Sequence, residues 1–279
     1  MSASSPTDTS LPLVSPAVFR RLVIGAIVYI AVVSAFFLAF PQVDQAASGL
    51  FYDTGAGFWA ASDPLFMRLR ELGPFLVKLV AVAALGVLVA AAAVPRLPDW
   101  MSLRAPLFLL STLALGPGVV VNAVFKNNWG RPRPNAVDLF GGDAPYVEVW
   151  RISDYCERNC SFVSGEASSG LWLVTLAFLA PPRWRIGILC VVLPLCLALS
   201  ANRVAFGGHF LSDTLLSWGI TLLVILGLYQ LFYRSPPGFL TEAALRRGFS
   251  AVAVALRRAC AGAWQRSRIA GRRFAAMFR

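Results

Sequence analysis

Long apolar runs alternate with short polar segments along most of the chain. Six of these runs approach the roughly 20 residues that an α-helix needs to cross a bilayer, although the fourth and fifth need flanking residues to do so. The runs are Val18 to Phe40, Pro74 to Val94, Ala105 to Phe125, Glu166 to Ala180, Ile186 to Ala201 and His209 to Phe232. Pro, Gly, Asp and Arg gather between them, where helices are expected to end. The pattern therefore predicts an all-α fold, a polytopic bundle of six transmembrane helices within residues 18–233.

The composition agrees with this pattern. Hydrophobic residues make up 57% of the chain and charged residues only 14%, whereas soluble domains average about 45–50% and about 25%. These values exclude an ordinary soluble domain, and no nucleic-acid partner is expected. The first apolar run exceeds the core of a signal peptide, and no small-residue cleavage site precedes Pro41. We therefore expect this run to remain as a membrane anchor.

Arginine placement predicts the orientation of the bundle. Lys and Arg collect in the cytoplasmic loops of membrane proteins, and four arginine-bearing segments fall on one predicted side. They contain Arg20 and Arg21, Arg96 and Arg104, Arg183 and Arg185, and the ten arginines of residues 234–279. The segments 42–73 and 126–165 lie on the other side and carry most of the acidic residues. Both termini are therefore expected in the cytoplasm.

Besides the short loops and residues 126–165, three segments lie outside the predicted spans. Residues 1–17 are rich in Ser, Thr and Pro and are expected to be disordered. The segment 42–73 carries aromatic residues but is too polar to span, so it forms either amphipathic helices on the membrane surface or a packed loop. Residues 234–279 set ten arginines against one acid, Glu242. Their helical apolar spacing predicts an amphipathic helix on anionic cytoplasmic headgroups, with disorder of the last dozen residues as the alternative.

Three polar clusters interrupt the apolar pattern. Residues 126–134 follow the third run, residues 161–166 enter the fourth, and residues 203–213 join the fifth and sixth. Taken singly, each has a structural explanation: headgroup anchors, a helix cap or a structural His–Asp pair. The predicted topology nevertheless brings all three to the non-cytoplasmic face. Such convergence is what an active site in a helical bundle requires.

The third cluster holds the only histidine of the chain, His209. Asp213 follows at i+4, one helical turn later, where the two side chains can pair, and Arg203 lies upstream. An imidazole beside a carboxylate and an arginine is suited to attack on phosphorus. His209 is therefore the candidate nucleophile.

The clusters resemble motifs of the type 2 phosphatidic acid phosphatase (PAP2) superfamily. Its first motif is Lys, six residues, then Arg-Pro, which Lys126 and Arg133-Pro134 match. Its second motif, Pro-Ser-Gly-His, is altered here to Val163-Ser164-Gly165-Glu166. The Ser-Phe-Val-Ser-Gly-Glu form of this segment also looks like that of bacterial lipid A phosphatases and their relatives.

The third motif of the superfamily is Ser-Arg, five residues, His, three residues, Asp. This chain keeps its spacing at Arg203, His209 and Asp213, with Asn202 in place of Ser. The resemblance implies that His209 forms a phosphohistidine that water then hydrolyses, and that Asp213 orients the ring and stabilises the imidazolium. It also implies that no metal or other cofactor is needed, and the scattered acids and lone histidine offer no convincing ligand set.

The remaining motif residues are expected to form a phosphate cradle. A phosphate monoester brings nearly two negative charges, and Lys126, Arg133 and Arg203 supply three positive charges. Ser164 and Gly165 open the fourth run, so its free backbone amides and positive dipole end can face the same oxygens. The cradle is expected to stabilise the charge on pentacoordinate phosphorus.

Glu166 departs from the family, whose histidine at this position protonates the leaving oxygen. A carboxylic acid must carry a proton to do the same. Nearby cations favour the carboxylate, whereas burial and an adjacent phosphate dianion favour the acid. Our hypothesis is that Glu166 is the general acid, effective mainly with substrate bound or with a good leaving group.

Two cysteines, Cys156 and Cys160, precede the altered motif. In an oxidising periplasm they can form a disulfide that stiffens the cradle, and the alternative is two free thiols.

The combined expectation is a lipid phosphatase of the bacterial inner membrane, with its site open to the periplasm. Candidate substrates are lipid A, undecaprenyl pyrophosphate, phosphatidylglycerol phosphate and phosphatidic acid. The alternatives are a lipid-to-lipid phosphotransferase with the same site, and a degenerate protein that binds or translocates lipid. The oligomeric state stays open.

Overall fold

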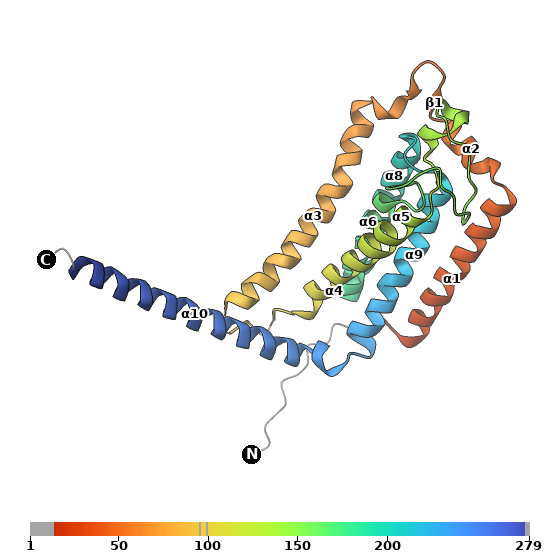
Figure 1. Ribbon diagram of the computed structural model, residues 1–279. Coiled ribbons are helices and arrows are strands. Elements are labelled where there is room, and N and C mark those ends of the chain that lie inside the picture. The colour runs from red at the N-terminus through yellow and green to blue at the C-terminus, as the bar shows by residue number, and fades with distance from the viewer. Residues whose placement is uncertain (1–13, 95, 99, 277–279) are drawn as a thin grey trace.

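Helices dominate the computed structural model of the chain, which describes residues 14–94, 96–98 and 100–276 (Figure 1). The helices are α1 (Pro16–Ala39), α2 (Gln42–Gly49), α3 (Pro64–Ala93), α4 (Arg104–Leu113), α5 (Lys126–Asn128), α6 (Gly165–Trp172), α7 (Thr175–Leu179), α8 (Pro182–Ala205), α9 (Leu211–Tyr229) and α10 (Glu242–Ala276). Two π-helical segments, Ala114–Phe125 and Gln230–Arg234, continue α4 and α9. Short 3-10 helices cover Trp59–Ala61, Pro134–Ala136, Asp138–Phe140 and Gly238–Leu240. Strands β1 (Tyr52–Asp53) and β2 (Gly57–Phe58) form an antiparallel hairpin.

Five helical stretches among the described residues are long and apolar enough to cross a membrane. They are Pro16–Ala39, Pro64–Ala93, Arg104–Asn128, Pro182–Ala205 and Leu211–Arg234. Each contains most of one predicted apolar run. Their boundaries differ from those of the runs by a few residues at most ends. In the last stretch, α9 begins at Leu211 and leaves His209 in the preceding turn.

Helix α3 begins at Pro64, well before the expected start at Pro74. Asp63 caps it, accepting hydrogen bonds from the backbone amides of Leu65 at 2.8 Å and Phe66 at 3.3 Å, and proline is favoured at the first helical position. The predicted outer segment 42–73 therefore ends at Asp63. The first turns of α3 contain charged residues, so the hydropathy pattern alone placed the start of this helix too late.

Residues 42–63 form α2 and the β1–β2 hairpin. Asp53 closes the hairpin turn by accepting hydrogen bonds from the amides of Gly55 at 2.8 Å and Ala56 at 2.9 Å. Phe58 is buried against Gly207, which has a φ of +61° and no room for a Cβ atom. This packing on the bundle fits the loop interpretation better than helices lying on the membrane surface.

The fourth apolar run is divided into α6 and α7. Backbone hydrogen bonds from Leu173 to Gly170 at 3.2 Å and from Val174 to Leu171 at 2.9 Å tighten the chain between them. Together the two helices cover only Gly165–Leu179, short of the roughly 20 residues of a full span. Helix α6 packs against α8, α9 and the first π-helical segment, and this places the altered motif inside the bundle.

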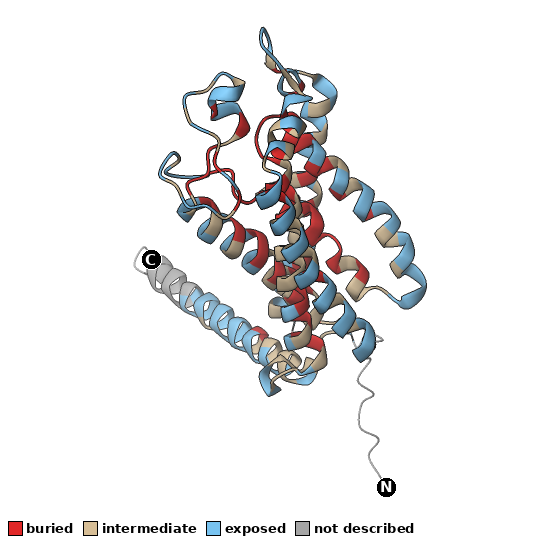
Figure 2. Ribbon diagram, turned by 90° about the vertical axis from the view of Figure 1, so that its right-hand side faces the viewer, coloured by how far each residue is buried: buried red, intermediate tan, exposed pale blue. Residues whose placement is uncertain are grey.

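Helices α6 and α9 lie near the centre of the bundle, where most buried residues are found (Figure 2). Half of the apolar stretch of α9 is buried, against 11% of that of α1. Trp172 of α6 is fully buried and donates its indole N–H to the Leu109 carbonyl at 3.1 Å and to Thr112 Oγ1 at 2.9 Å. The outer helices α1 and α3 instead expose apolar side chains such as Val32 and Val82, as expected for surfaces that face lipid.

Helix α10 extends away from the bundle at the end opposite α2 and β1 (Figure 1). Its first residue, Glu242, accepts hydrogen bonds from the amides of Leu103 at 2.9 Å and Arg104 at 3.2 Å and from Ser102 Oγ at 3.0 Å. These bonds fix the start of the tail helix to the segment before α4. At the other terminus, α1 already begins at Pro16, and residues 1–13 of the expected disordered segment lie outside the described residues.

Candidate active site

The three polar clusters of the sequence are joined at the end of the bundle that carries α2 and the hairpin. The amide of Cys160 donates to the Lys126 carbonyl at 3.0 Å, and the amide of Ser161 donates to the Arg131 carbonyl at 2.9 Å. The amide of Ser164 donates to the Asp213 carbonyl at 3.2 Å. Main-chain hydrogen bonds therefore hold the second cluster between the first and the third.

His209 is almost completely buried in the turn between α8 and α9. Its Nδ1 lies 2.7 Å from the carbonyl oxygen of Ser161. A carbonyl can only accept, so Nδ1 carries a proton and donates it. The expected pairing with Asp213 is not a hydrogen bond, because Asp213 Oδ2 is 4.0 Å from Nδ1. Nε2 is left with the lone pair that a nucleophile needs.

The surroundings of His209 keep the ring neutral. Burial lowers the pKa of His209 well below its usual value near 6.5, and the charges of Lys126, Arg203 and Arg133 lower it further. The hydrogen bond to Ser161 opposes this shift without cancelling it. The imidazole is therefore neutral at neutral pH, with its single proton on Nδ1.

Asp213 acts on His209 through Ser161. Its Oδ2 accepts hydrogen bonds from Ser161 Oγ at 2.5 Å and from the Phe210 amide at 3.0 Å. The same Ser161 offers its carbonyl oxygen to the ring of His209. Asp213 thus fixes the residue that orients the imidazole, and it lies close enough to stabilise a positive charge on the ring.

Arg131 is fully buried behind this arrangement and forms ion pairs with two carboxylates. Its Nη1 lies 2.6 Å from Asp213 Oδ1, and its Nη2 lies 2.9 Å from Asp44 Oδ2 of α2. Asp44 also accepts from the Ser212 amide at 2.8 Å. Burial would lower the pKa of Arg131, but Asp213 and Asp44 raise it overall. The guanidinium therefore stays charged and connects α2 to the start of α9.

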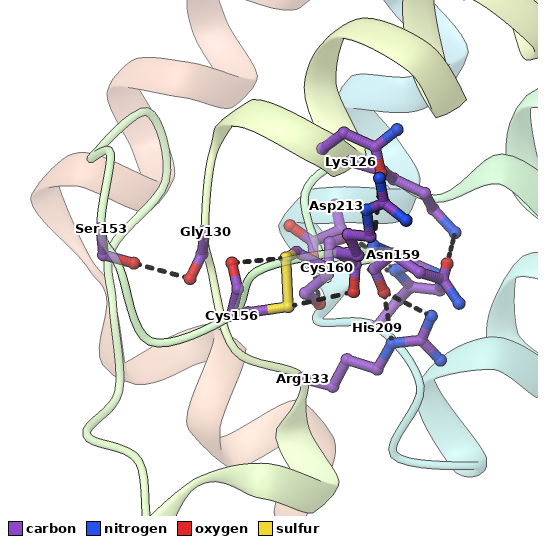
Figure 3. The surroundings of a disulfide bond; sticks show 12 residues. Lys126, Gly130, Arg133, Ser153, Cys156, Asn159, Cys160, His209 and Asp213 are labelled. Carbon is purple, nitrogen blue, oxygen red and sulfur yellow. Dashed lines mark hydrogen bonds and ion pairs between the residues drawn. A yellow bond between two sulfur atoms is a disulfide. The ribbon is translucent and has the colours of Figure 1, made fainter.

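Two cradle cations converge on Asn159, as Figure 3 shows. Lys126 Nζ donates to Asn159 Oδ1 at 3.3 Å, while Arg133 donates to the Asn159 carbonyl through Nε at 3.2 Å and Nη2 at 2.8 Å. A disulfide joins Cys156 to Cys160 and encloses Asn159 in a short loop. The disulfide loop thus holds the acceptor that positions both cations.

Arg203 and Glu166 form an ion pair beside the histidine. Arg203 Nε lies 3.0 Å from Glu166 Oε2, although the N–H is not aligned for a hydrogen bond. Arg203 is 4% exposed and Glu166 is 32% exposed. A Cβ atom at Gly208 would collide with the guanidinium, so the glycine makes room for it.

Ser164 and Gly165 begin α6 as expected. Ser164 Oγ accepts from the Ala167 amide at 3.3 Å, so its hydroxyl serves as the helix cap. Gly165 packs against Asn122, whose Oδ1 would be 2.9 Å from an added Cβ atom. Within the described part of the chain, no group accepts a hydrogen bond from the amides of Gly165 or Glu166. These amides are free to bind an anion at the helix start.

The site therefore combines a neutral imidazole, three cations and free amides at a helix start. Lys126, Arg133 and Arg203 all lie close enough to act electrostatically on His209. Such an arrangement can bind a phosphate group and attack it. Within the described residues, no group of three His, Cys, Asp or Glu side chains is placed to hold a metal ion.

Three buried residues that support the site were not among the predicted site residues: Arg131, Asp44 and Ser161. Arg131-Pro132 repeats the Arg-Pro pair of the first motif two residues early, and this duplication was the available signal. Asp44 follows Pro41 in a segment with no motif. The role of Ser161 depends on its backbone carbonyl, which sequence does not reveal.

Comparisons with known proteins agree with the motifs. Residues 105–237 match the family model described as the PAP2 superfamily. The "Lipid A 4'-phosphatase" of Francisella tularensis subsp. novicida is 32% identical over 202 residues, which cover 71% of this chain and 90% of that protein. Those of Rhizobium leguminosarum and Rhizobium etli are each 41% identical over 122 residues, or 44% of this chain. The matched region spans about half the length of these two relatives, 52% and 48%.

The fold also has a counterpart among solved structures. The crystal structure of a transmembrane PAP2 type phosphatidylglycerolphosphate phosphatase from Bacillus subtilis matches with a TM-score of 0.53 at 16% identity, covering 78% of this chain and 99% of that chain. At this low identity the match supports a shared fold and nothing more specific. The resemblance seen in the motifs is confirmed: the chain belongs to the PAP2 superfamily, and it is similar to the lipid A 4'-phosphatases within it.

Proposed function

We propose that the protein is a lipid phosphatase that removes a phosphate from a lipid headgroup, with lipid A as the first candidate substrate. The observation that carries this proposal is a neutral, buried His209 with a free Nε2 among three cations. The relatives' names favour lipid A. Undecaprenyl pyrophosphate, phosphatidylglycerol phosphate and phosphatidic acid remain the comparison substrates.

In the first step, Nε2 of His209 attacks phosphorus and a P–N bond forms. The bond from phosphorus to the headgroup oxygen breaks, and its electron pair goes to that oxygen. Lys126, Arg133 and Arg203 stabilise the charge on the equatorial oxygens. The positive charge that develops on the imidazole is stabilised by Asp213, 4.0 Å from Nδ1.

In the second step, water attacks the phosphohistidine, the P–N bond breaks and its electron pair returns to Nε2. Glu166 is proposed to give a proton to the leaving oxygen in the first step and to take one from water in the second. A bound phosphate competes for Arg203, the present partner of Glu166. Weakening of this ion pair would release Glu166 for proton transfer, so its proposed role depends on bound substrate.

The two ends of the molecule support an orientation in the bacterial inner membrane. The site end carries the Cys156–Cys160 disulfide, which suits an oxidising periplasm. The opposite end carries the arginine-rich α10, which suits the cytoplasm. We therefore infer a multi-pass protein whose site opens to the periplasm.

The test is release of inorganic phosphate from each candidate lipid, presented separately in detergent micelles. We expect release to be fastest from lipid A and to fall at least about a thousandfold in His209→Gln. Glu166→Gln is expected to lose most activity, with pyrophosphate substrates the least affected. Loss of substrate without phosphate release would instead indicate transfer to a second lipid. Absence of turnover with every lipid would indicate a degenerate lipid-binding protein.

A further inference from the structure

Arg70 adds a fourth cation to the site from outside the three motifs. It lies in the early part of α3 and is exposed. Its guanidinium carbon is 5.3 Å from the ring centre of Phe206, and that of Arg203 is 5.8 Å from the same centre. Cation–π contact with one ring therefore holds both arginines near each other.

The charge of Arg70 acts on the cradle. It repels Arg203. Burial lowers the pKa of Arg133, and Arg70 lowers it further while Glu166 raises it. Arg70 has no carboxylate within ion-pair distance and no hydrogen-bond acceptor among the described residues. Like charges gathered in this way are destabilising unless an anion occupies the space near them.

Arg70 differs from Lys126 and Arg203 in its exposure to solvent. Lys126 is 8% exposed and Arg203 is 4% exposed, so both can enclose the phosphate that reacts with the buried His209. Arg70 is exposed, so it is available to a group further out on the ligand. The contact between helices is fixed, because Asn202 Nδ2 donates to the Phe66 carbonyl at 3.0 Å, one turn before Arg70.

We propose that Arg70 binds a second anionic group on the substrate headgroup, a phosphate or carboxylate distinct from the phosphate that is removed. Arg70 then selects lipids that carry two anionic groups over those that carry one. This inference rests on the proposed function, since the reacting phosphate must occupy the inner cations. It makes Arg70 a specificity-determining residue with no part in the bond-breaking steps.

The test compares two substrates in neutral detergent micelles: lipid A with both phosphates, and lipid A that keeps only the phosphate to be removed. We expect Arg70→Gln to lower the ratio of kcat/KM for the first lipid over the second about tenfold, mainly through KM. Arg70→Lys should recover part of the ratio. Arg68→Gln, an exposed arginine two residues earlier on α3, is the matched control and should leave the ratio unchanged.

An unchanged ratio in Arg70→Gln would overturn the inference, whether or not its overall activity falls. An effect that appears only after an anionic phospholipid is added to the micelles would also overturn it, because the anion would then belong to a neighbouring lipid. Failure of the parent protein to release phosphate from either lipid would count against the proposed function instead.

Discussion

Neighbouring residues control the chemistry of His209 in two ways. The Ser161 carbonyl fixes which nitrogen carries the proton, and burial together with the surrounding cations keeps the ring neutral. Both effects favour attack by Nε2. Asp213 acts indirectly, because its carboxylate accepts a hydrogen bond from the hydroxyl of Ser161 and so helps to position the carbonyl that orients the ring. The site therefore holds the proposed nucleophile in its neutral form before any substrate arrives.

The single histidine makes this state directly measurable. In a tag-free protein with ¹⁵N-labelled histidine, NMR follows only His209. Because burial and then the charges of Lys126, Arg203 and Arg133 lower its pKa, we expect the ring to be neutral at pH 7 and to titrate well below pH 6.5. Lys126→Gln removes one of these charges and should move the midpoint upward. A midpoint at or above 6.5 in the parent would refute this account of the nucleophile.

The buried Arg131 gives a second prediction at the residue scale. Asp44→Ala leaves Arg131 with one carboxylate partner in a fully buried position. Loss of one partner of a buried ion pair costs about 3–5 kcal/mol, so thermal unfolding in detergent should begin at a clearly lower temperature. Asp143→Asn, an exposed acid in the 126–165 segment, is the control and should change little. Equal stability of both variants would show that the Asp44–Arg131 pair is not structural.

Sequence found the groups that carry charge and chemistry, but not the groups that position them. The sequence pointed to Lys126, Arg133, Arg203 and His209 because they lie in polar clusters beside apolar runs and match the spacing of the PAP2 motifs. The Asp44–Arg131–Asp213 arrangement draws one residue from each of three distant segments. A buried ion pair of this kind leaves no periodic pattern, so only the folded chain reveals it.

Element boundaries depend on capping more than on hydropathy. Apolar runs predicted where the long helices lie, yet α3 starts at Pro64 because Asp63 caps it. The fourth run shows the opposite case. Its residues are apolar, but the turn at Leu173 and Val174 divides it into two helices too short to span singly. Hydropathy cannot detect such a division because the local turn keeps the same composition.

Helix α10 gives a prediction at the element scale. Val252, Leu256 and Trp264 are exposed apolar residues that share one face at spacings of four and eight with the free thiol Cys260. We expect this face to enter the membrane surface while arginines bind anionic headgroups. In vesicles, an impermeant maleimide should label Cys260 more slowly with anionic lipid than with neutral lipid, in a background where Cys190 and Cys196 are alanine.

The arginines supply the control for this experiment. Arg257→Gln with Arg258→Gln should reduce the difference between anionic and neutral vesicles, as should added salt, because the attraction is electrostatic. Equal labelling rates in both kinds of vesicle for the parent protein would mean that α10 does not bind the membrane through its charges.

At the scale of the whole molecule, the fold brings three segments to one end of a bundle and places α10 at the other (Figure 1). This convergence followed from the sequence because each cluster adjoins an apolar run whose direction could be assigned. The packing of α2 and the hairpin on the site did not follow, since their contacts with Arg131 and Gly207 are long-range.

The central claim is that His209 becomes covalently phosphorylated during turnover. The most direct measurement is rapid acid-free quenching of the enzyme with lipid A, followed by mass spectrometry of the peptide that contains His209. The account predicts a phosphorylated peptide whose modification is lost in acid and is absent from His209→Gln. Phosphate release from lipid A at the parental rate by His209→Gln would contradict it.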